Sequence, residues 1–301
     1  MERNIWLKIE YDGSGFYGWQ RQPDRRTVQG VLEEALSKFC DCDVQLQGTS
    51  RTDAGVHALG QCASFKGDFG IPVDRIPQAV NNYLAGGMSS LNPAGDVRIL
   101  EAKEMPPEFH ARYDCKGKTY RYIIRNSTDI DVFRKNYCYQ MREFLDADRM
   151  KEAAQYIIGT HDFACFQTSG GTERETTVRT VKSLVIDRQI KAWSGDGGIV
   201  GNDDSNAGRT AEKSGIASSG RADEYVNTAS LGKITDCDII IEITGDGFLY
   251  NMVRIIVGTL IEVGLGKREP SDLKRVIESK DRSQAGYTAP AAGLYLKEIY
   301  Y

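Results

Sequence analysis

The sequence predicts an α+β protein built on a mixed or antiparallel sheet. Residues 4–11 alternate between apolar and polar side chains, which is typical of a half-buried strand. Residues 27–39 carry apolar side chains at helical spacing, and Thr27 stands where a helix N-cap is expected. Strand-like and helix-like segments do not alternate strictly along the rest of the chain, which argues against a doubly wound parallel sheet.

The remaining elements follow from the same two periodicities. Amphipathic or strongly apolar patterns predict a helix over residues 146–158, ended by Gly159, another over residues 249–261 and a last one after Pro270. Short runs rich in β-branched and aromatic residues predict strands at 60–65, 97–102, 119–125, 178–186, 238–244 and 293–299.

The composition changes late in the chain. Between Lys191 and Thr235 lie eight glycines and many Ser, Asp and Asn residues, with little apolar periodicity. We therefore expect a flexible insertion over about residues 191–233. The predicted domains are residues 1–104, an N-terminal α+β unit, and residues 105–301, a C-terminal α+β unit that contains this insertion.

The overall composition indicates a folded protein of a reducing compartment. Hydrophobic residues make up 41% of the chain and charged residues 27%, so a packed core is expected and global disorder is not. No apolar run reaches the roughly 18 residues that a membrane span needs, and the N-terminus lacks the apolar region of a secretory signal. The seven cysteines are irregularly spaced and accompany only three histidines, so we expect reduced thiols, a cytoplasmic location and no metal site.

Two segments of the chain resemble each other. Residues 10–16 read Glu-Tyr-Asp-Gly-Ser-Gly-Phe, and residues 242–248 read Glu-Ile-Thr-Gly-Asp-Gly-Phe. Each segment follows a predicted strand. The echo indicates either two related α+β halves that face each other across a cleft or two unrelated glycine turns, and the residues alone leave both interpretations open.

Residues 48–58, Gly-Thr-Ser-Arg-Thr-Asp-Ala-Gly-Val-His-Ala, have the clearest chemical character. Small and polar residues surround one arginine, Arg51, and one carboxylate, Asp53. A glycine-flanked loop lets the backbone approach a ligand, and an arginine there is able to hold phosphate, stack on a ring or pair with the carboxylate. Composition alone favours a surface loop in which Asp53 caps a turn and Arg51 is solvated. His57 is more typical of a structural residue than of a catalytic one.

Residues 51–58 closely resemble the catalytic loop of the TruA family of tRNA pseudouridine synthases. Agreement over many further segments in family order makes chance improbable and favours a functional role for Asp53. One departure lies in the loop itself, where Ser50 replaces the second glycine that commonly precedes the arginine. The other matching segments are residues 11–20, 27–33, 109–112, 120–122, 159–163, 247–248, 252–254, 257–258 and 293–296.

The resemblance implies an enzyme that isomerises uridine to pseudouridine at positions 38, 39 and 40 in the anticodon stem-loop of tRNA. The bond between N1 and C1′ breaks and C5 of the turned base bonds to C1′, so no redox step occurs and no cofactor is expected. Asp53 matches the catalytic aspartate, which acts as nucleophile or as base. Arg254 matches the arginine that pairs with it. A carboxylate in a pocket that excludes water needs such a cation to stay ionised.

The resemblance also assigns residues and partners to RNA binding. Tyr120 matches the tyrosine that lies against the flipped base, and Arg51 matches the arginine that helps to extrude the nucleotide. Family members are homodimers that grip tRNA across both subunits. Their fold is a two-domain α+β body with a continuous, mostly antiparallel sheet and an active cleft between two similar subdomains.

The net charge of −4 disfavours a protein that coats nucleic acid non-specifically, but it is compatible with a local basic cleft. Each basic residue near the motifs is individually more typical of an ordinary surface charge. The candidates for the walls of such a cleft are Arg21, Arg25, Arg26, Lys116, Lys118, Arg121 and Arg125.

Three other functions fit parts of this pattern. A pseudouridine synthase of other RNA sites would carry the same motifs. A non-catalytic RNA-binding protein would not need to keep Asp53, Arg254 and Tyr120 together. A carboxylate-dependent hydrolase usually has two carboxylates or a metal at its site, whereas only one strong acidic candidate is evident here.

Overall fold

The structure is a computed structural model that describes residues 2–86, 95–169, 175–190 and 236–301. The insertion predicted over residues 191–233 lies outside the described residues. In the part that is described, no helix is long and apolar enough to cross a membrane.

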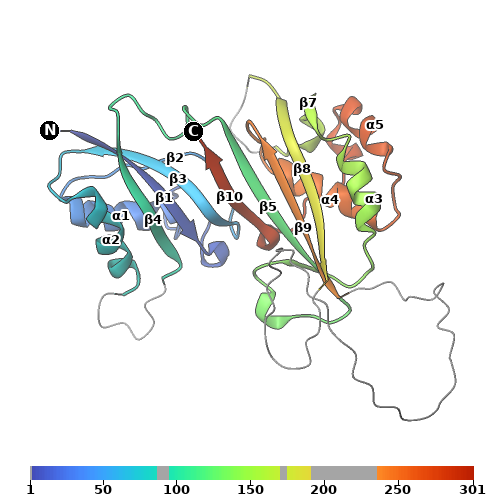
Figure 1. The fold of residues 1–301 in the computed structure, drawn as a ribbon, viewed down its shortest axis with the longest axis horizontal. Helices are drawn as coiled ribbons and strands as arrows, with labels where there is room; N and C mark the ends of the chain where they lie inside the picture. The colour runs from blue at the N-terminus through green and yellow to red at the C-terminus, as the bar shows by residue number, and fades with distance from the viewer. Residues whose placement is uncertain (1, 87–94, 170–174, 191–235) are drawn as a thin grey trace, which may run out of the picture.

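In the described part of the chain, ten strands form one sheet (Figure 1). Its main path has the order β4-β1-β3-β10-β5-β9-β8-β7, while β2 pairs with β3 and β6 with β5. Most of these pairs are antiparallel, which confirms the predicted fold class. The strands are Arg3–Tyr11 (β1), Gln47–Gly48 (β2), His57–Gly67 (β3), Val97–Met105 (β4), Gly117–Asn126 (β5), Tyr139–Met141 (β6), Gly159–Asp162 (β7), Val178–Ile190 (β8), Cys237–Gly245 (β9) and Leu294–Tyr300 (β10).

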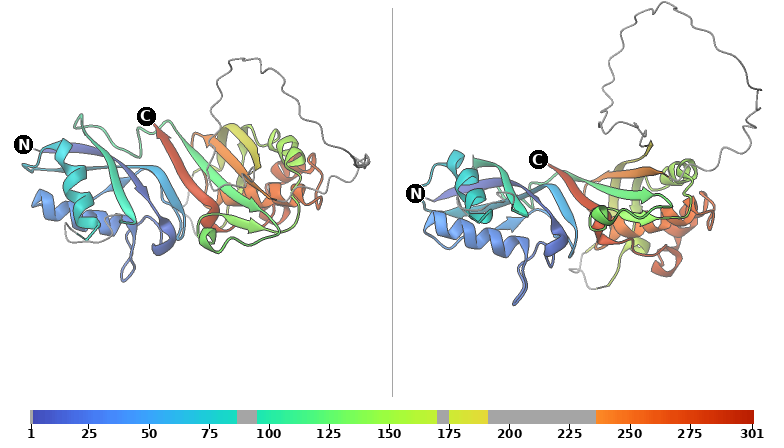
Figure 2. Two further views of the ribbon diagram at one scale, coloured as in Figure 1. Left: turned by 60° about the horizontal axis from the view of Figure 1, so that its bottom comes forward. Right: turned by 90° about the horizontal axis from the view of Figure 1, so that it is seen from below.

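Strand β10 joins the two halves of this sheet. It pairs in parallel with β3, where Tyr295 lies opposite His57, and antiparallel with β5, where Leu296 lies opposite Tyr120. Figure 2 shows β10 between β3 and β5 in both of its views. The predicted domain boundary after residue 104 falls at the end of β4, and the division into two domains stays a prediction.

Five helices are described beside the sheet. They are Val28–Cys40 (α1), Ile76–Leu84 (α2), Ala147–Ala154 (α3), Met252–Gly264 (α4) and Asp272–Ser279 (α5). The predicted cap of α1 is confirmed, because the Thr27 hydroxyl accepts a hydrogen bond from the Gly30 amide at 3.3 Å. Strands β1 and β9, whose ends carry the echoed segments, are each followed in the chain by a helix of 13 residues, α1 and α4. The 3-10 helix Gly13–Gly15 and a loop separate β1 from α1, whereas a shorter segment separates β9 from α4.

One helix prediction was wrong in part, and one helix was not predicted. The helix predicted over residues 146–158 ends at Ala154, and the chain continues in tighter turns in which the Tyr156 amide bonds the Ala153 oxygen. Helix α2 was missed because it is short and contains asparagines, which are poor helix formers. Its Asn81 side chain instead bonds the backbone of Ile99 on β4, with both distances 2.8 Å.

The strands of the C-terminal half present one buried and one more accessible face. Burial alternates along β9 as expected for a sheet covered on one side. The more accessible face carries ion pairs, in which Arg121 and Lys297 both contact Glu242, at 2.7 and 2.8 Å. Helix α4 lies in the core and is buried along almost its whole length.

The segment after α5 lies directly against α4, and this contact requires glycine at position 258. A Cβ atom on Gly258 would lie 1.9 Å from the backbone oxygen of Tyr287. The same segment contains Ala289, whose amide donates to the backbone oxygen of Arg254 at 3.1 Å.

We expect Gly258→Ala to lower the free energy of unfolding by about 1 to 3 kcal/mol, because the backbone of residue 287 must move away from α4. In an uncrowded helix the same change would be stabilising. Urea unfolding followed by circular dichroism measures the effect. Gly70→Ala is the matched control, since a Cβ atom there meets nothing within 4 Å. Equal stability of the two variants would contradict the prediction.

Candidate active site

The loop over residues 48–56 is held by contacts from outside it. The backbone oxygen of Thr52 accepts a hydrogen bond from the Trp19 amide at 3.0 Å. The side-chain amide of Gln61 donates to the backbone oxygen of Ser50 at 2.7 Å. Because these backbone groups are hydrogen-bonded to residues outside the loop, the loop is held against the protein and is not a solvated surface segment.

Asp53 begins a tight turn through its backbone. Its carbonyl oxygen accepts a hydrogen bond from the Val56 amide at 3.1 Å. Gly55 has a φ of 78° at the third position of this turn, which glycine adopts without steric cost. The turn bond uses the backbone oxygen of Asp53, so its carboxylate is left for another partner.

His57 anchors the end of the loop and is 2% exposed. Its Nδ1 accepts a hydrogen bond from the Gly13 amide at 3.1 Å, and its Nε2 lies 2.8 Å from the backbone oxygen of Asn136. The ring stacks on Tyr295 of β10, with centroids 4.7 Å apart. Burial lowers the pKa of His57, which favours the neutral ring. This is the geometry of a structural residue.

Asp53 and Arg254 meet although 201 residues separate them in the chain. Nη1 of Arg254 lies 3.1 Å from Oδ2 of Asp53, and the side chains of the arginine and the aspartate are 17% and 24% exposed. Burial raises the pKa of Asp53 above its ordinary value, while the charge and the hydrogen bond of Arg254 act in the opposite direction. The arginine is therefore the group that favours the ionised carboxylate.

The guanidinium of Arg254 is fixed by three acceptors. Besides Asp53, its Nη1 donates to the side-chain oxygen of Asn251 at 2.9 Å, and its Nε donates to the backbone oxygen of Ala289 at 2.7 Å. Asn251 has a φ of 61° and directly precedes α4, a conformation that asparagine tolerates better than most residues. Sequence reasoning missed Asn251, and its type at the start of a predicted helix was the available signal.

Tyr120 reaches the same place from strand β5 and is 7% exposed. Its hydroxyl lies 2.7 Å from Oγ of Ser50, so it contacts the loop that carries Asp53. Its ring meets Phe248 edge to face, with centroids 5.3 Å apart. Phe248 belongs to the second echoed segment, and sequence reasoning gave it no place in the site.

These side chains line one cavity of about 510 Å³, a size typical of sites for small ligands. Arg51, Asp53, Tyr120 and Arg254 all contribute to its wall. The cavity therefore brings together residues from a loop near the N-terminus, from β5 and from α4. Further polar side chains in the wall, not singled out as site residues from the sequence, are Gln20, Gln22, Arg112, Gln167 and Asn251.

The cavity holds more positive than negative groups. Its cations are Arg51, Arg112, Lys118 and Arg254, and its carboxylates are Asp53 and Asp246. Asp246 accepts a hydrogen bond from the Thr180 amide at 3.1 Å, so one of its oxygens is committed to strand β8. Among the described residues, no group of three or more His, Cys, Asp or Glu gathers as metal ligands would.

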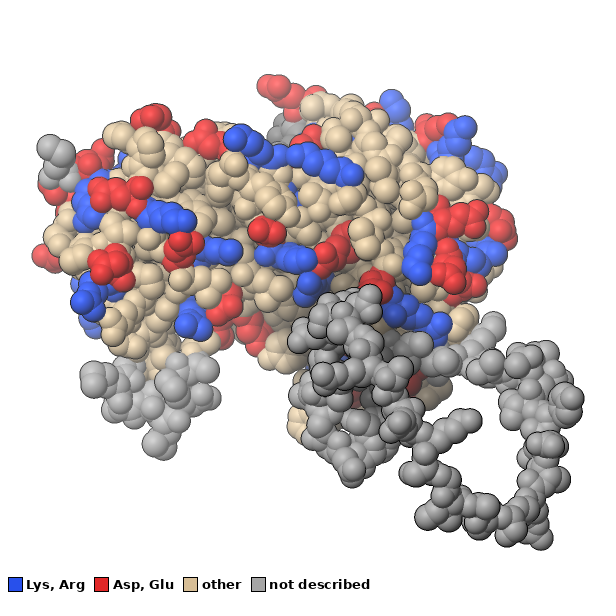
Figure 3. Space-filling view, in the orientation of Figure 1, with Lys and Arg blue, Asp and Glu red and all other residues tan. Residues whose placement is uncertain are grey.

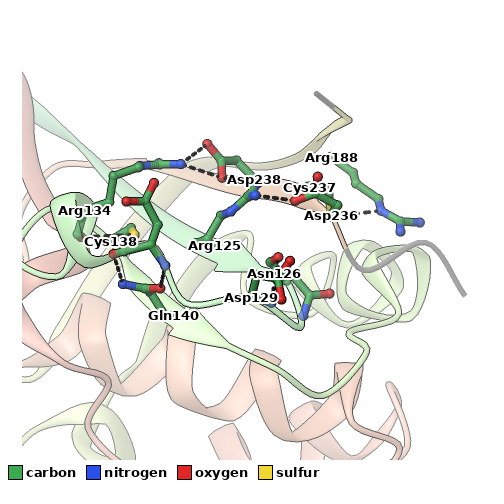
Figure 4. Close-up of polar contacts among 12 residues, drawn as sticks. Arg125, Asn126, Asp129, Arg134, Cys138, Gln140, Arg188, Asp236, Cys237 and Asp238 are labelled. Atoms are coloured by element: carbon green, nitrogen blue, oxygen red, sulfur yellow. Dashed lines mark hydrogen bonds and ion pairs between the residues drawn. The ribbon is translucent and has the colours of Figure 1, made fainter. Parts of the chain in front are cut away.

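Most of the other basic candidates pair with carboxylates elsewhere, Arg21 with Glu33, Arg26 with Asp96 and Arg121 with Glu242. Figure 3 shows Lys and Arg side chains interspersed with Asp and Glu over the face that it draws. Arg125 is 11% exposed and points toward Asp236 and Asp238, and Arg134 contacts Asp238 at 2.9 Å (Figure 4). Lys118 lines the cavity, whereas neither Arg121 nor Arg125 does.

Comparisons with known proteins identify the family of this chain. A family profile described as tRNA pseudouridine synthase matches residues 8–114 and 153–301, which include Arg51, Asp53 and Arg254 but not Tyr120. This chain belongs to the tRNA pseudouridine synthase family. It is similar to tRNA pseudouridine synthase A 2 of Clostridium tetani, with 41% identity over 304 residues and the whole of both chains covered. It is also 40% identical to tRNA pseudouridine synthase A of Acetivibrio thermocellus and of Caldicellulosiruptor bescii, over 99% of this chain and all of each relative.

In this member of the synthase family, we expect Arg254→Met to reduce activity about 100-fold at pH 7, because a misplaced carboxylate loses its productive geometry. The activity that remains in the Arg254→Met protein should rise at a higher pH than the activity of the wild type does. Removal of the cation raises the pKa of Asp53 further, so ionisation occurs later as the pH increases.

A pH–rate profile of the Arg254→Met protein tests this. Arg254→Lys keeps the positive charge but not the planar set of donors. We expect the acid limb of its pH–rate profile to lie at a pH between those of the wild type and of Arg254→Met. An acid limb that coincides in wild type and Arg254→Met would show that Arg254 does not control Asp53.

Proposed function

We propose that this protein isomerises uridine to pseudouridine in the anticodon stem-loop of tRNA, with Asp53 as the reacting carboxylate. It is an isomerase by its membership of the family. The observation that supports the proposal for Asp53 is its ion pair with Arg254 inside a cavity of about 510 Å³. One ionised carboxylate in such a site is sufficient for nucleophilic or general-base chemistry on a glycosidic bond.

The two oxygens of Asp53 have different tasks in this proposal. Oδ2 receives the hydrogen bond of Arg254, so Oδ1 is the oxygen that we assign to the substrate. Positive charge that develops at C1′ while the N1–C1′ bond breaks is stabilised by the adjacent carboxylate, as in glycoside chemistry. Arg254 keeps the carboxylate ionised and turned toward the cavity.

The remaining site residues hold the nucleotide outside its stack. A uridine within structured RNA must leave the helix before its glycosidic bond is reached. We assign the ring of Tyr120, supported by Phe248, to contact with the flipped base, a type of contact worth about 1 to 3 kcal/mol. Arg51 is exposed at the cavity and is assigned to extrusion of the nucleotide and to its phosphate.

Substrate position, assembly and location are proposed from the resemblance and from the relatives. The relatives named tRNA pseudouridine synthase A align over their whole length. We infer that the modified uridines are at positions 38, 39 and 40, that two copies of the chain grip one tRNA, and that the enzyme works in the cytoplasm without a cofactor.

We expect Asp53→Asn to abolish pseudouridine formation and to leave tRNA binding within about twofold of wild type, because the amide keeps the shape and loses the charge. Release of tritium from tRNA labelled at C5 of uridine measures the reaction, and filter retention of labelled tRNA measures binding. If the Asp53→Asn protein releases tritium at the wild-type rate, Asp53 takes no part in the chemistry.

We expect an unmodified tRNA transcript in which the uridines at positions 38 to 40 are replaced by cytidine to release no tritium with the wild-type enzyme. A transcript with every other uridine replaced and one of these three retained should release it. Release from the first transcript and not from the second would assign the enzyme to other RNA sites, which is the alternative that shares all of its motifs.

A further inference from the structure

Ser50 stands where the family commonly has glycine, and its side chain makes contacts that a glycine cannot make. It is 7% exposed, and its Oγ lies 2.7 Å from the hydroxyl of Tyr120. Nζ of Lys118 lies 3.3 Å from the same Oγ and 2.9 Å from the backbone oxygen of Thr49. The serine hydroxyl therefore lies between an ammonium group and a phenol that lines the cavity.

The chemistry of the three groups fixes one step of this chain and permits a direction for the other. An ammonium group only donates hydrogen bonds, so Lys118 donates to Oγ of Ser50. The Ser50 hydroxyl has one proton and two lone pairs, so it can accept from Lys118 and still donate its proton to the Tyr120 oxygen 2.7 Å away. The phenol proton of Tyr120 is then free to point away from Ser50.

The position of Ser50 is itself well determined. The side-chain amide of Gln61 donates a hydrogen bond to its backbone oxygen, and Nζ of Lys118 donates one to the backbone oxygen of the preceding residue, Thr49. Since Ser50 and Tyr120 are both almost fully buried, the hydroxyl group has little freedom to choose solvent instead.

We propose that Ser50 is a positioning residue that donates a hydrogen bond to Tyr120 and directs the phenol proton of Tyr120 into the cavity, toward the substrate beside Asp53. This inference rests on the proposed function. According to this proposal, Tyr120 contacts the flipped base with its ring and donates an oriented hydrogen bond with its hydroxyl. Relatives with glycine at this position lack the hydroxyl that sets this orientation.

The ionisation of Tyr120 agrees with a donor role. Burial raises its pKa to about 12, the bond to Ser50 lowers it, and the nearby charge of Asp53 raises it. The phenol therefore keeps its proton at neutral pH and is able to donate it in a hydrogen bond.

A double-mutant cycle on the full-length protein tests the proposal. We expect Ser50→Ala to lower kcat for tritium release about three- to tenfold with KM within about twofold, the effect typical of one lost hydrogen bond. In a Tyr120→Phe background the same change should have no further effect, because no phenol oxygen remains to accept. Ser50→Thr keeps the hydroxyl and should restore most of kcat.

Tyr300→Phe is the matched control. Its hydroxyl makes a similar bond to a side chain of β5, at 2.8 Å from Oγ1 of Thr119, but Tyr300 does not line the cavity. We expect its kcat and KM to equal those of the wild type. Equal losses from Ser50→Ala in the wild-type and Tyr120→Phe backgrounds would overturn the proposal.

A second measurement does not depend on activity. Fluorotyrosine placed at position 120 reports its own titration by ¹⁹F NMR. We expect both Ser50→Ala and Lys118→Met to raise the pKa of the residue at position 120. Ser50→Ala removes the donor that stabilises the phenolate, and Lys118→Met removes the cation that bonds this serine. Unchanged titration in both variants would also overturn the proposal. If the wild-type protein releases no tritium but Ser50→Ala and Lys118→Met still raise the pKa at position 120, the proposed function is overturned and the hydrogen-bond chain stands.

Discussion

The ion pair between Asp53 and Arg254 is the interaction on which the site depends, because the arginine favours the ionised form of the carboxylate and holds it in place. Burial raises the pKa of Asp53, and the adjacent Arg254 acts in the opposite direction. The pair also connects a loop between β2 and β3 to the start of α4, so it is a contact between segments from opposite ends of the chain. Around it, the loop, Asn251 and Ala289 keep both side chains in one geometry.

The regular elements with strong periodicity could be predicted from the sequence. Strand β1, helix α1 with its Thr27 cap and strand β9 each follow from local patterns that tertiary contacts reinforce. Helix α2 could not, since Asn81 uses its side chain to bond β4 rather than solvent. The end of α3 could not either, because the apolar pattern continues through Ile157 while the backbone tightens into turns.

The site residues were reached through resemblance, and their geometry shows why periodicity alone would have missed them. Nothing near Asp53 in the sequence indicates its partner, which lies 201 residues away. Asn251 and Phe248 belong to turns whose roles depend on the final arrangement of α4 and β9. Arg125 shows the opposite case, in which a basic residue near a motif faces Asp236 and Asp238 and lies outside the cavity (Figure 4).

Strand β10 has a consequence for how the enzyme is made. It follows every other strand in the described chain, yet it occupies the middle of the sheet, between β3 and β5. During synthesis on a ribosome the earlier strands emerge first, and their two groups lack a common edge until β10 arrives. The segments that carry Asp53 and Arg254 therefore belong to two groups of strands that, among the described residues, are paired to each other through β10.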